Sequence, residues 1–262
     1  MGEPEKKNKV RATVRLRVVR QDSPDKPGSR RVEEFELPFS PQMTIHGCLE
    51  AVRKKPETSA GARVLPIAWE ASCLEESCGS CAMIINGRAR LACSTSVESV
   101  SPAGQTITLE PLSKFPVERD LVVDRGRMSD ALERVHAWVT LGDLQSAAIG
   151  PRESEENQQR RLELASYIGC GACLEACPVY VPGGDFVGAA AINRVHLKNQ
   201  HPSGAMEKRK RVRSLMGNGG VADCGKAQVC VEVCPKQIPL TESISKVSRD
   251  ATKELFWGWL AD

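Results

Sequence analysis

The stretch of sequence that decides the fold is CLEESCGSCAMIINGRARLAC, residues 73–93. It holds four cysteines in the spacing C-x4-C-x2-C-x11-C, namely Cys73, Cys78, Cys81 and Cys93. Three thiols this close together require a loop that folds around the group they bind, and Gly79 lets the backbone approach that group closely. The dipeptide Asn86-Gly87 between two apolar segments predicts a β-hairpin with a type I′ turn, which brings the fourth cysteine back to the loop.

Thiolates at this spacing are the ligands of a plant-type [2Fe-2S] cluster. The pair Cys78-x2-Cys81 taken alone would also suit a zinc knuckle. The full four-cysteine pattern, set inside a predicted sheet domain, favours the [2Fe-2S] cluster over zinc.

The surrounding residues predict strands first and helices later. Apolar residues that alternate with polar ones predict strands over 9–19 and 32–37. The hairpin signal at Asn86-Gly87 predicts strands over 83–85 and 88–92, and a last strand is expected over 106–109. Between them, residues 45–54 have helical spacing, with Cys48 as a buried small hydrophobe. After about residue 120 the pattern predicts helices over 130–141, 155–167, 188–199 and 205–216.

The predicted fold class is therefore α+β. An N-terminal β-grasp domain of the plant-type [2Fe-2S] ferredoxin kind is expected over residues 10–118, after a flexible N-terminus of residues 1–9. An all-helical, bacterial-ferredoxin-like domain is expected over residues 119–262.

Two further cysteine runs lie in the second half, Cys170-x2-Cys173-x3-Cys177-Pro178 and Cys224-x5-Cys230-x3-Cys234-Pro235. Bacterial ferredoxins use C-x2-C-x2-C-x3-C-P, and the fourth cysteine of each run ligates the other cluster. In the last run Ala227 stands at the second ligand position. Cys224 and Cys230, with Cys177 crossing over, then make a three-cysteine site that suits [3Fe-4S].

The middle run departs from the same template at its first ligand position, which holds Tyr167. Its cluster would receive Cys170, Cys173 and the crossing Cys234, again three cysteines. Three explanations stay open: a [4Fe-4S] cluster with a fourth ligand that is not cysteine, a second [3Fe-4S] cluster, or a residue missing from the sequence. We favour the [4Fe-4S] cluster.

Composition narrows the class of protein. The chain has 262 residues and a net charge of +3, a smaller basic excess than nucleic-acid-binding domains usually carry. Its eleven cysteines are an odd number and indicate reduced thiols instead of a secreted disulfide framework. The segment Met1–Lys9 is charged and has no apolar h-region, so a secretory signal is not expected there. Without an apolar run of roughly 18 residues, any link to a membrane must come through a partner.

The order of the two domains, with the motifs Cys78-Gly-Ser-Cys-Ala-Met, Asn86-Gly87-Arg88 and Cys234-Pro-Lys, resembles the iron–sulfur subunits of succinate dehydrogenase and fumarate reductase. The resemblance extends from about Val10 to Trp257. In the C-terminal half it is closest to the menaquinone-linked bacterial type, through residues 201–206 and 219–228.

This resemblance implies an electron-transfer subunit without catalytic residues of its own. A partner flavoprotein would oxidise succinate on FAD, and the clusters would pass electrons one at a time to a quinone at a membrane anchor subunit. Haem is a further candidate cofactor in the partner subunits, and no nucleic acid is expected. The location implied is the cytoplasmic face of the inner membrane, where the anchor would hold the subunit peripherally.

The resemblance also assigns ligands. The set implied for the [2Fe-2S] cluster nearest the flavin is Cys73, Cys78, Cys81 and Cys93. The set implied for the middle [4Fe-4S] cluster is Cys170, Cys173 and Cys234. The set implied for the [3Fe-4S] cluster nearest the quinone is Cys177, Cys224 and Cys230. Pro182 and Gly225 stand where ubiquinone-linked members have a tryptophan and a histidine, which favours menaquinone.

Two other functions compete with this interpretation. A fumarate reductase would use the same chain of clusters in the opposite direction. An interaction module holding zinc or a cluster would bind a partner and conduct no electrons.

Several features outside the cysteine runs are also interpreted. The four histidines, His46, His136, His196 and His201, are expected in surface or packing roles. The basic run of residues 208–213 is interpreted as a solvated helix face, with contact to anionic lipid head groups as the alternative. The aromatic stretch of residues 256–260 is expected at an interface with a partner subunit.

Overall fold

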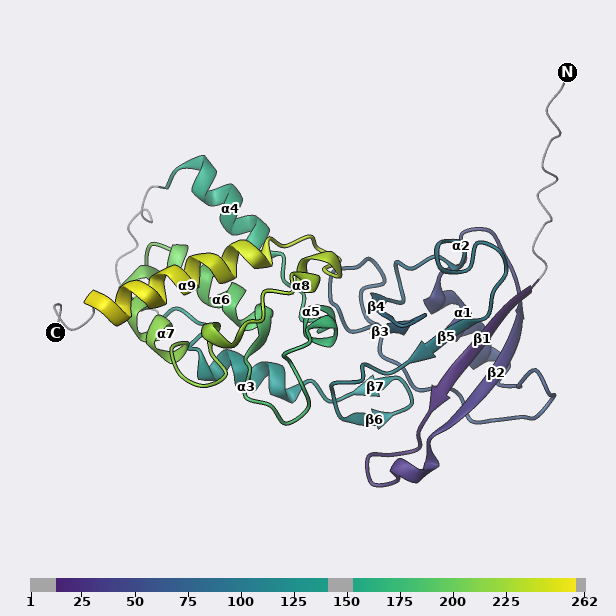
Figure 1. Ribbon diagram of the computed structural model, residues 1–262. Coiled ribbons are helices and arrows are strands. Elements are labelled where there is room, and N and C mark those ends of the chain that lie inside the picture. Colours follow the sequence, from purple (N-terminus) through teal and green to yellow (C-terminus); the bar gives the residue numbers. More distant parts are fainter. Residues whose placement is uncertain (1–12, 141–152, 258–262) are drawn as a thin grey trace, which may run out of the picture.

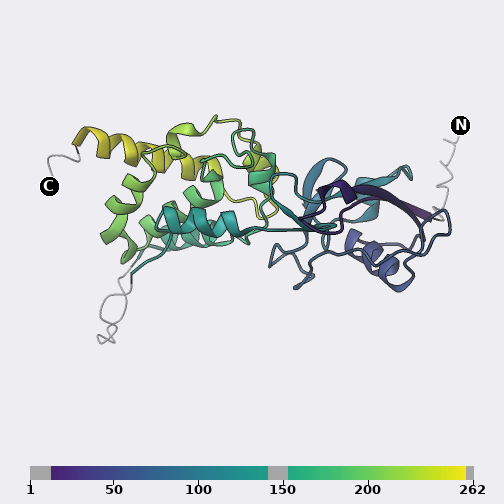
Figure 2. The same cartoon turned by 90° about the horizontal axis from the view of Figure 1, so that it is seen from below.

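The computed structural model describes residues 13–140 and 153–257, which form a sheet-containing half and a helical half placed end to end (Figures 1 and 2). The sheet has the strand order β2-β1-β5-β3-β4. Its strands are β1 (Thr13–Arg20), β2 (Arg31–Pro38), β3 (Ala82–Ile85), β4 (Arg88–Leu91) and β5 (Ile107–Glu110). β1 runs parallel to β5 and antiparallel to β2, and β3 runs antiparallel to both of its neighbours.

The first strand shows why the sheet forms. Val14, Leu16 and Val18 are fully buried, whereas the residues between them are exposed, so one face of β1 supplies the core. The helix α1 (Ile45–Lys54) packs its apolar face, with Cys48 fully buried, into the same core. The predicted helix and the predicted burial of Cys48 are therefore confirmed.

The hairpin of β3 and β4 turns at Asn86 and Gly87, both with positive φ (48° and 76°), as a type I′ turn requires. The short elements η1 (Pro27–Ser29) and α2 (Val97–Val100) lie in connecting segments of this half. All five predicted strands are present. The structure confirms them with shifts of no more than one residue at the described ends, and the part of the first prediction before residue 13 lies outside the described residues.

A small hairpin of β6 (Val117–Arg119) and β7 (Val122–Val123) connects the two halves. Asp120 at its turn is buried and accepts a hydrogen bond from Arg20 Nε on β1 at 2.8 Å, which holds the hairpin against the sheet. The predicted domain boundary at 118/119 falls inside this hairpin and stays a prediction.

The second half is helical and is built around α6. Its helices are α3 (Gly126–Arg134), α4 (Glu155–Ala165), α5 (Ala172–Ala176), α6 (Gly188–Gln200), α7 (Lys208–Ser214), α8 (Val229–Glu232) and α9 (Leu240–Trp257), with the short turns η2 (Gly204–Glu207) and η3 (Val221–Asp223). α6 is buried on most of its sides and lies alongside α9 (Figure 1).

The structure corrects several of the expected helices. The first begins at Gly126, four residues earlier than expected, and ends at Arg134, close before His136 takes a left-handed φ of 51°. The helix expected over 205–216 divides into η2 and α7. The longest described helix, α9, was not predicted from the sequence.

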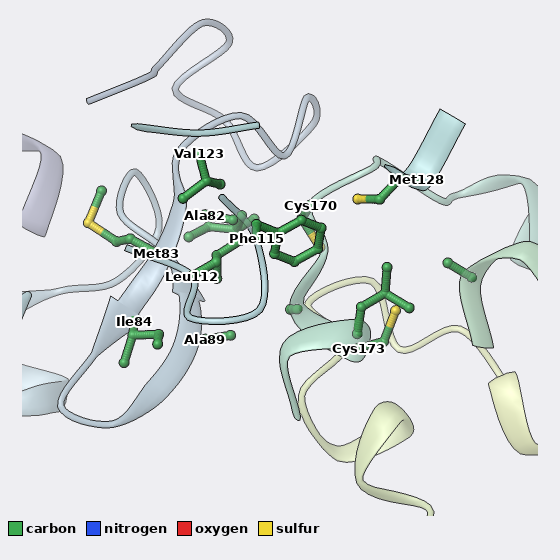
Figure 3. Packing of buried hydrophobic residues seen from close by; sticks show 14 of the residues in the cluster. Ala82, Met83, Ile84, Ala89, Leu112, Phe115, Val123, Met128, Cys170 and Cys173 are labelled. Carbon is green, nitrogen blue, oxygen red and sulfur yellow. The ribbon is translucent and has the colours of Figure 1, made fainter. Parts of the chain in front are cut away.

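One hydrophobic core runs through both halves. Figure 3 shows Leu112 and Phe115 beside Cys170 and Cys173 at the junction. A Cβ atom added at Gly171 would lie 3.2 Å from the Phe115 ring and 3.5 Å from Leu112, so the two halves are closely packed here.

Candidate iron–sulfur cluster sites

The loop of the first cysteine run directs backbone N–H groups at a thiol. Cys73 Sγ accepts hydrogen bonds from the backbone N–H groups of Ser77 at 3.2 Å and Cys78 at 3.3 Å, and from that of Glu75 at 3.5 Å. Left-handed φ angles at Leu74 and Glu76 turn the loop around the sulfur. Such N–H groups stabilise a thiolate, which is the form that binds iron, so the donor set fits a cluster.

The other three thiols of this run lie close by. A backbone hydrogen bond from Cys73 and hydrogen bonds from Ser80 lower the pKa of Cys78 to about 6. Cys81 is buried, which raises its pKa to about 11, and it contacts the thiol of Cys93. The structure thus brings Cys93 across the β3–β4 hairpin to the loop, as the spacing predicts.

The middle site combines residues from both later runs. Cys170 lies just before α5 and Cys173 lies in its first turn, and both are buried. They line one cavity with Cys234 and Tyr167. The structure therefore places Cys234 with the thiols of the second run. Burial raises the pKa values of Cys170 and Cys173, and the neighbouring thiols raise them further. A bound metal ion deprotonates such thiols outright, so these groups still fit a cluster.

The outer site holds the remaining three thiols. Cys224 and Cys230 line a separate cavity against α9, whose walls include Ile244 and Thr241. Burial raises the pKa of Cys230, and the nearby Cys177 and Cys224 raise it further, which places the crossing Cys177 with this pair. Lys226 and Gln228 have left-handed φ angles of 54° and 62°, on either side of Ala227.

Within residues 13–140 and 153–257, no three His, Cys, Asp or Glu side chains meet as closely as the ligands of a single metal ion do. A cluster distributes its ligands over several iron atoms, so its thiols lie farther apart than those around one ion.

The first and second cysteine runs touch each other across the junction. A Cβ atom added at Gly79 would lie 2.4 Å from the carbonyl oxygen of Ile168 and 2.9 Å from the amide nitrogen of Cys170. Arg125 Nη2 donates to the carbonyl oxygen of Ser80 at 3.0 Å, and Lys114 Nζ donates to that of Cys177. The Gly79 contact places the first loop against the second run, and the two hydrogen bonds are further links between the halves.

Sequence reasoning missed one residue beside the middle site. Tyr180 is 1% exposed, and its hydroxyl has no hydrogen-bond partner among the described residues. Burial raises the pKa of Tyr180, and the nearby thiol of Cys173 also raises it. Its position three residues after Cys177 was the available signal, but its burial depends on Phe115 and Arg127.

The basic run of residues 208–213 packs against α9. Lys208 pairs with Asp250 at 2.8 Å, and Arg209 and Arg213 both pair with Glu254 at 2.7 Å. The interpretation as a solvated face is wrong for Arg211, which is fully buried and donates to backbone carbonyl oxygens. The side chains of Phe256 and Trp257 are exposed, and residues 258–260 of the aromatic stretch lie outside the described residues.

The described helices include none that is both long and apolar enough to cross a membrane.

Comparison with known families gives two matches, a "2Fe-2S iron-sulfur cluster binding domain" over residues 15–130 and a "4Fe-4S dicluster domain" over residues 164–238. They confirm the predicted fold class, a [2Fe-2S] domain followed by a helical domain for two clusters.

Whole-chain relatives agree with these matches. The chain is 42% identical to the succinate dehydrogenase iron-sulfur subunit of Bacillus subtilis, over 93% of this chain and 94% of the relative. It is 31% identical to the fumarate reductase iron-sulfur subunit of Haemophilus influenzae, over 84% of this chain and 86% of that one. A chain of the apo Sdh1 complex of Mycobacterium smegmatis has the same fold, with a TM-score of 0.78 at 23% identity and coverage of 93% and 97% of the two chains. The chain therefore belongs to the family of electron-transferring iron–sulfur subunits of succinate dehydrogenase and fumarate reductase.

Proposed function

We propose that this chain carries electrons one at a time from a succinate-oxidising flavoprotein subunit that holds FAD to a quinone at a membrane anchor subunit. The observation that carries the proposal is the serial arrangement of the three thiol groups. The first loop touches the middle run at Gly79 and Cys170, and Cys173 of the middle site is near Cys230 of the outer site. Electrons can therefore pass through the sites in order.

Each site has a distinct proposed ligand set. The [2Fe-2S] site uses Cys73, Cys78, Cys81 and Cys93. The middle [4Fe-4S] site uses Cys170, Cys173 and Cys234, and the [3Fe-4S] site uses Cys177, Cys224 and Cys230. The buried thiols and the N–H groups around Cys73 support these sets. Iron–sulfur clusters held there supply the one-electron carriers.

The quinone is proposed to bind near the outer site, and Pro182 and Gly225 support menaquinone over ubiquinone. The subunit would lie on the cytoplasmic face of the inner membrane, held there by the anchor. Membership of the family supports both partners, the flavoprotein and the anchor.

The test is the variant Cys93→Ser in the purified complex, studied by EPR both in the air-oxidised state, where a [3Fe-4S] cluster gives its signal, and after reduction, where the [2Fe-2S] and [4Fe-4S] clusters give theirs. It should abolish or alter the [2Fe-2S] signal and leave the other two signals intact, because its thiol lies beside that of Cys81 in the first run. Cys48→Ala is the matched control, since it removes a cysteine of the same half that lies in α1 and outside every run. Loss of all three signals in Cys93→Ser would contradict the separate ligand sets. A wild-type protein that holds zinc in place of the clusters would contradict the proposed electron transfer.

Fumarate reduction is the second candidate, since fumarate reductase subunits are among the relatives. The same thiol sites serve either direction of electron flow. Rates of succinate oxidation and fumarate reduction, measured with the same purified complex and matched quinone and quinol, decide between the two.

A further inference from the structure

Tyr167 stands where the ferredoxin template requires a cysteine, and the structure places it at the site that this cysteine would serve. It follows the end of α4 at Ala165, and it lines the same cavity as Cys170, Cys173 and Cys234. The rest of that cavity is lined by apolar residues and Lys236. Tyr167 is therefore a fourth residue that borders the place where three thiols gather.

The surroundings of Tyr167 hold the phenol ring in this position. The guanidinium carbon of Arg194, on α6, lies 5.6 Å from the centre of the ring, and the ring packs against the hydrophobic core. The side chain is only partly exposed. A cation above the ring face stabilises this orientation, and a positive charge nearby also favours an ionised phenol.

A deprotonated phenol carries the same charge as the thiolate of the cysteine that is missing at this position. Thiolate and phenolate each carry one negative charge, so a cluster with three thiolates and one phenolate has the net charge of a four-cysteine cluster. Tyrosine is an established iron ligand in proteins, as in the haem enzyme catalase. Serine or water at this place would bring a far weaker acid than either group.

Burial opposes ionisation of the free phenol, as it does for the neighbouring thiols. Burial raises the pKa of Tyr167, and the same effect raises those of Cys170 and Cys173. Since a bound metal deprotonates the buried thiols beside the phenol, the same change is open to the phenol. The O–H bond breaks as the iron–oxygen bond forms, and the proton passes to solvent.

We propose that Tyr167 is the fourth ligand of the middle cluster and holds its fourth iron through the phenolate oxygen. This inference rests on the proposed function, because it requires that Cys170, Cys173 and Cys234 bind a cluster. The rival outcome is a middle site with three ligands, which would hold [3Fe-4S] and leave Tyr167 only as packing.

The test counts [3Fe-4S] spins per chain by EPR in the air-oxidised, purified complex, together with iron content. The wild type should show about one [3Fe-4S] spin, from the outer site. Tyr167→Phe keeps the ring and removes the oxygen, so the spin count should double and one iron per chain should be lost. Tyr167→Cys completes the four-cysteine template and should return the count to one.

A second readout reports the bond itself. Resonance Raman spectra excited in the visible region should show phenolate vibrations in the wild type, and these should be absent from both Tyr167 variants. Tyr180→Phe is the matched control, because it removes the hydroxyl of the other tyrosine in the chain. It should keep the wild-type spin count and the phenolate vibrations.

The outcomes separate this inference from the proposed function. Two [3Fe-4S] spins in the wild type, or a Tyr167→Phe protein with the spin count and iron content of the wild type, would overturn the ligand role and leave the electron-transfer sites standing. A wild-type complex with a [2Fe-2S] signal and no middle cluster of either kind would also overturn the ligand role. Absence of every cluster signal from this chain would overturn both.

Discussion

Tyr180 lies beside the middle site, and its hydroxyl has no hydrogen-bond partner among residues 13–140 and 153–257. Its ring lies 6.1 Å from that of Phe115 and 4.0 Å from the guanidinium carbon of Arg127, which encloses it. A buried hydroxyl without an acceptor costs about 1–3 kcal/mol. Because Cys173 is near, a sulfur of the middle cluster is the acceptor that this arrangement offers.

The variant Tyr180→Phe tests that hydrogen bond. A donor to a cluster sulfur stabilises the reduced, more negative state, so its loss should lower the midpoint potential of the middle cluster. A hydrogen bond of about 1 kcal/mol corresponds to a few tens of millivolts for one electron. Redox titration followed by EPR measures the shift, and the [2Fe-2S] potential in the same sample serves as the control. Equal middle-cluster potentials in wild type and variant would disprove the bond.

The two tyrosines also show what sequence can predict at this scale. Tyr167 is visible in the sequence because it interrupts a motif with fixed spacing. Tyr180 belongs to no motif, and its environment is made by Phe115 and Arg127, which are distant in sequence. Spacing therefore predicts which thiols gather, whereas the groups that surround a cluster depend on the tertiary fold.

Among the elements, α1 and α9 differ in how far local sequence determines them. The bounds of α1 are predicted correctly because its signals are local: Thr44 caps the first turn, and basic residues end the last. α9 was missed because serine and threonine, which have weak helix propensity, recur along it. Its stability comes from the burial of Ile244 and Val247 and from packing against α6.

A buried polar network joins the helices α6 and α9. Gln200 donates to His196 Nε2 (2.8 Å), so His196 Nδ1–H donates to Ser243 (3.0 Å), and Ser243 donates to Asn193 (2.9 Å). This order of donors and acceptors requires a neutral imidazole. His196 is buried, so the packing role expected for it is confirmed. Burial lowers the pKa of His196 below its usual value near 6.5.

The network makes the α6–α9 contact sensitive to acid. Since the folded-state pKa is lowered, the stabilisation is fully present above about pH 6.5 and is lost as the pH falls through the folded-state pKa. His196→Asn should weaken the contact by about 1–3 kcal/mol at pH 7.5 and flatten its pH dependence. Hydrogen exchange of the α6 and α9 amides at pH 7.5 and 5.5, corrected for intrinsic rates, measures both effects. His201→Asn, at the end of the same helix and outside the network, is the control. An unchanged pH dependence in His196→Asn would contradict the role of this histidine.

For the whole molecule, the decisive contact is the close approach of the first loop to the middle run. Gly79 has a φ of 75°, and the space beside it is filled by the backbone of Ile168 and Cys170. The hairpin residue Gly87 has nearly the same φ, 76°, with no atom within 4 Å of an added Cβ. The two glycines therefore share one backbone conformation and differ in their surroundings.

Substitutions at Gly79 and Gly87 separate the cost of backbone strain at positive φ from the cost of disturbing the contact between the two halves. Gly79→Ala and Gly87→Ala both place a side chain at positive φ, at a shared cost of about 1–3 kcal/mol. Only Gly79→Ala must also displace backbone atoms of the middle run, so it should destabilise the protein by about a further 1–3 kcal/mol. Urea denaturation of the complex, followed by the visible absorbance of its clusters, measures the difference. Because the displaced atoms flank the thiol of Cys170, electron transfer from the first site to the middle site should slow in Gly79→Ala alone. Equal denaturation midpoints and equal transfer rates in the two variants would mean that the halves do not depend on this contact.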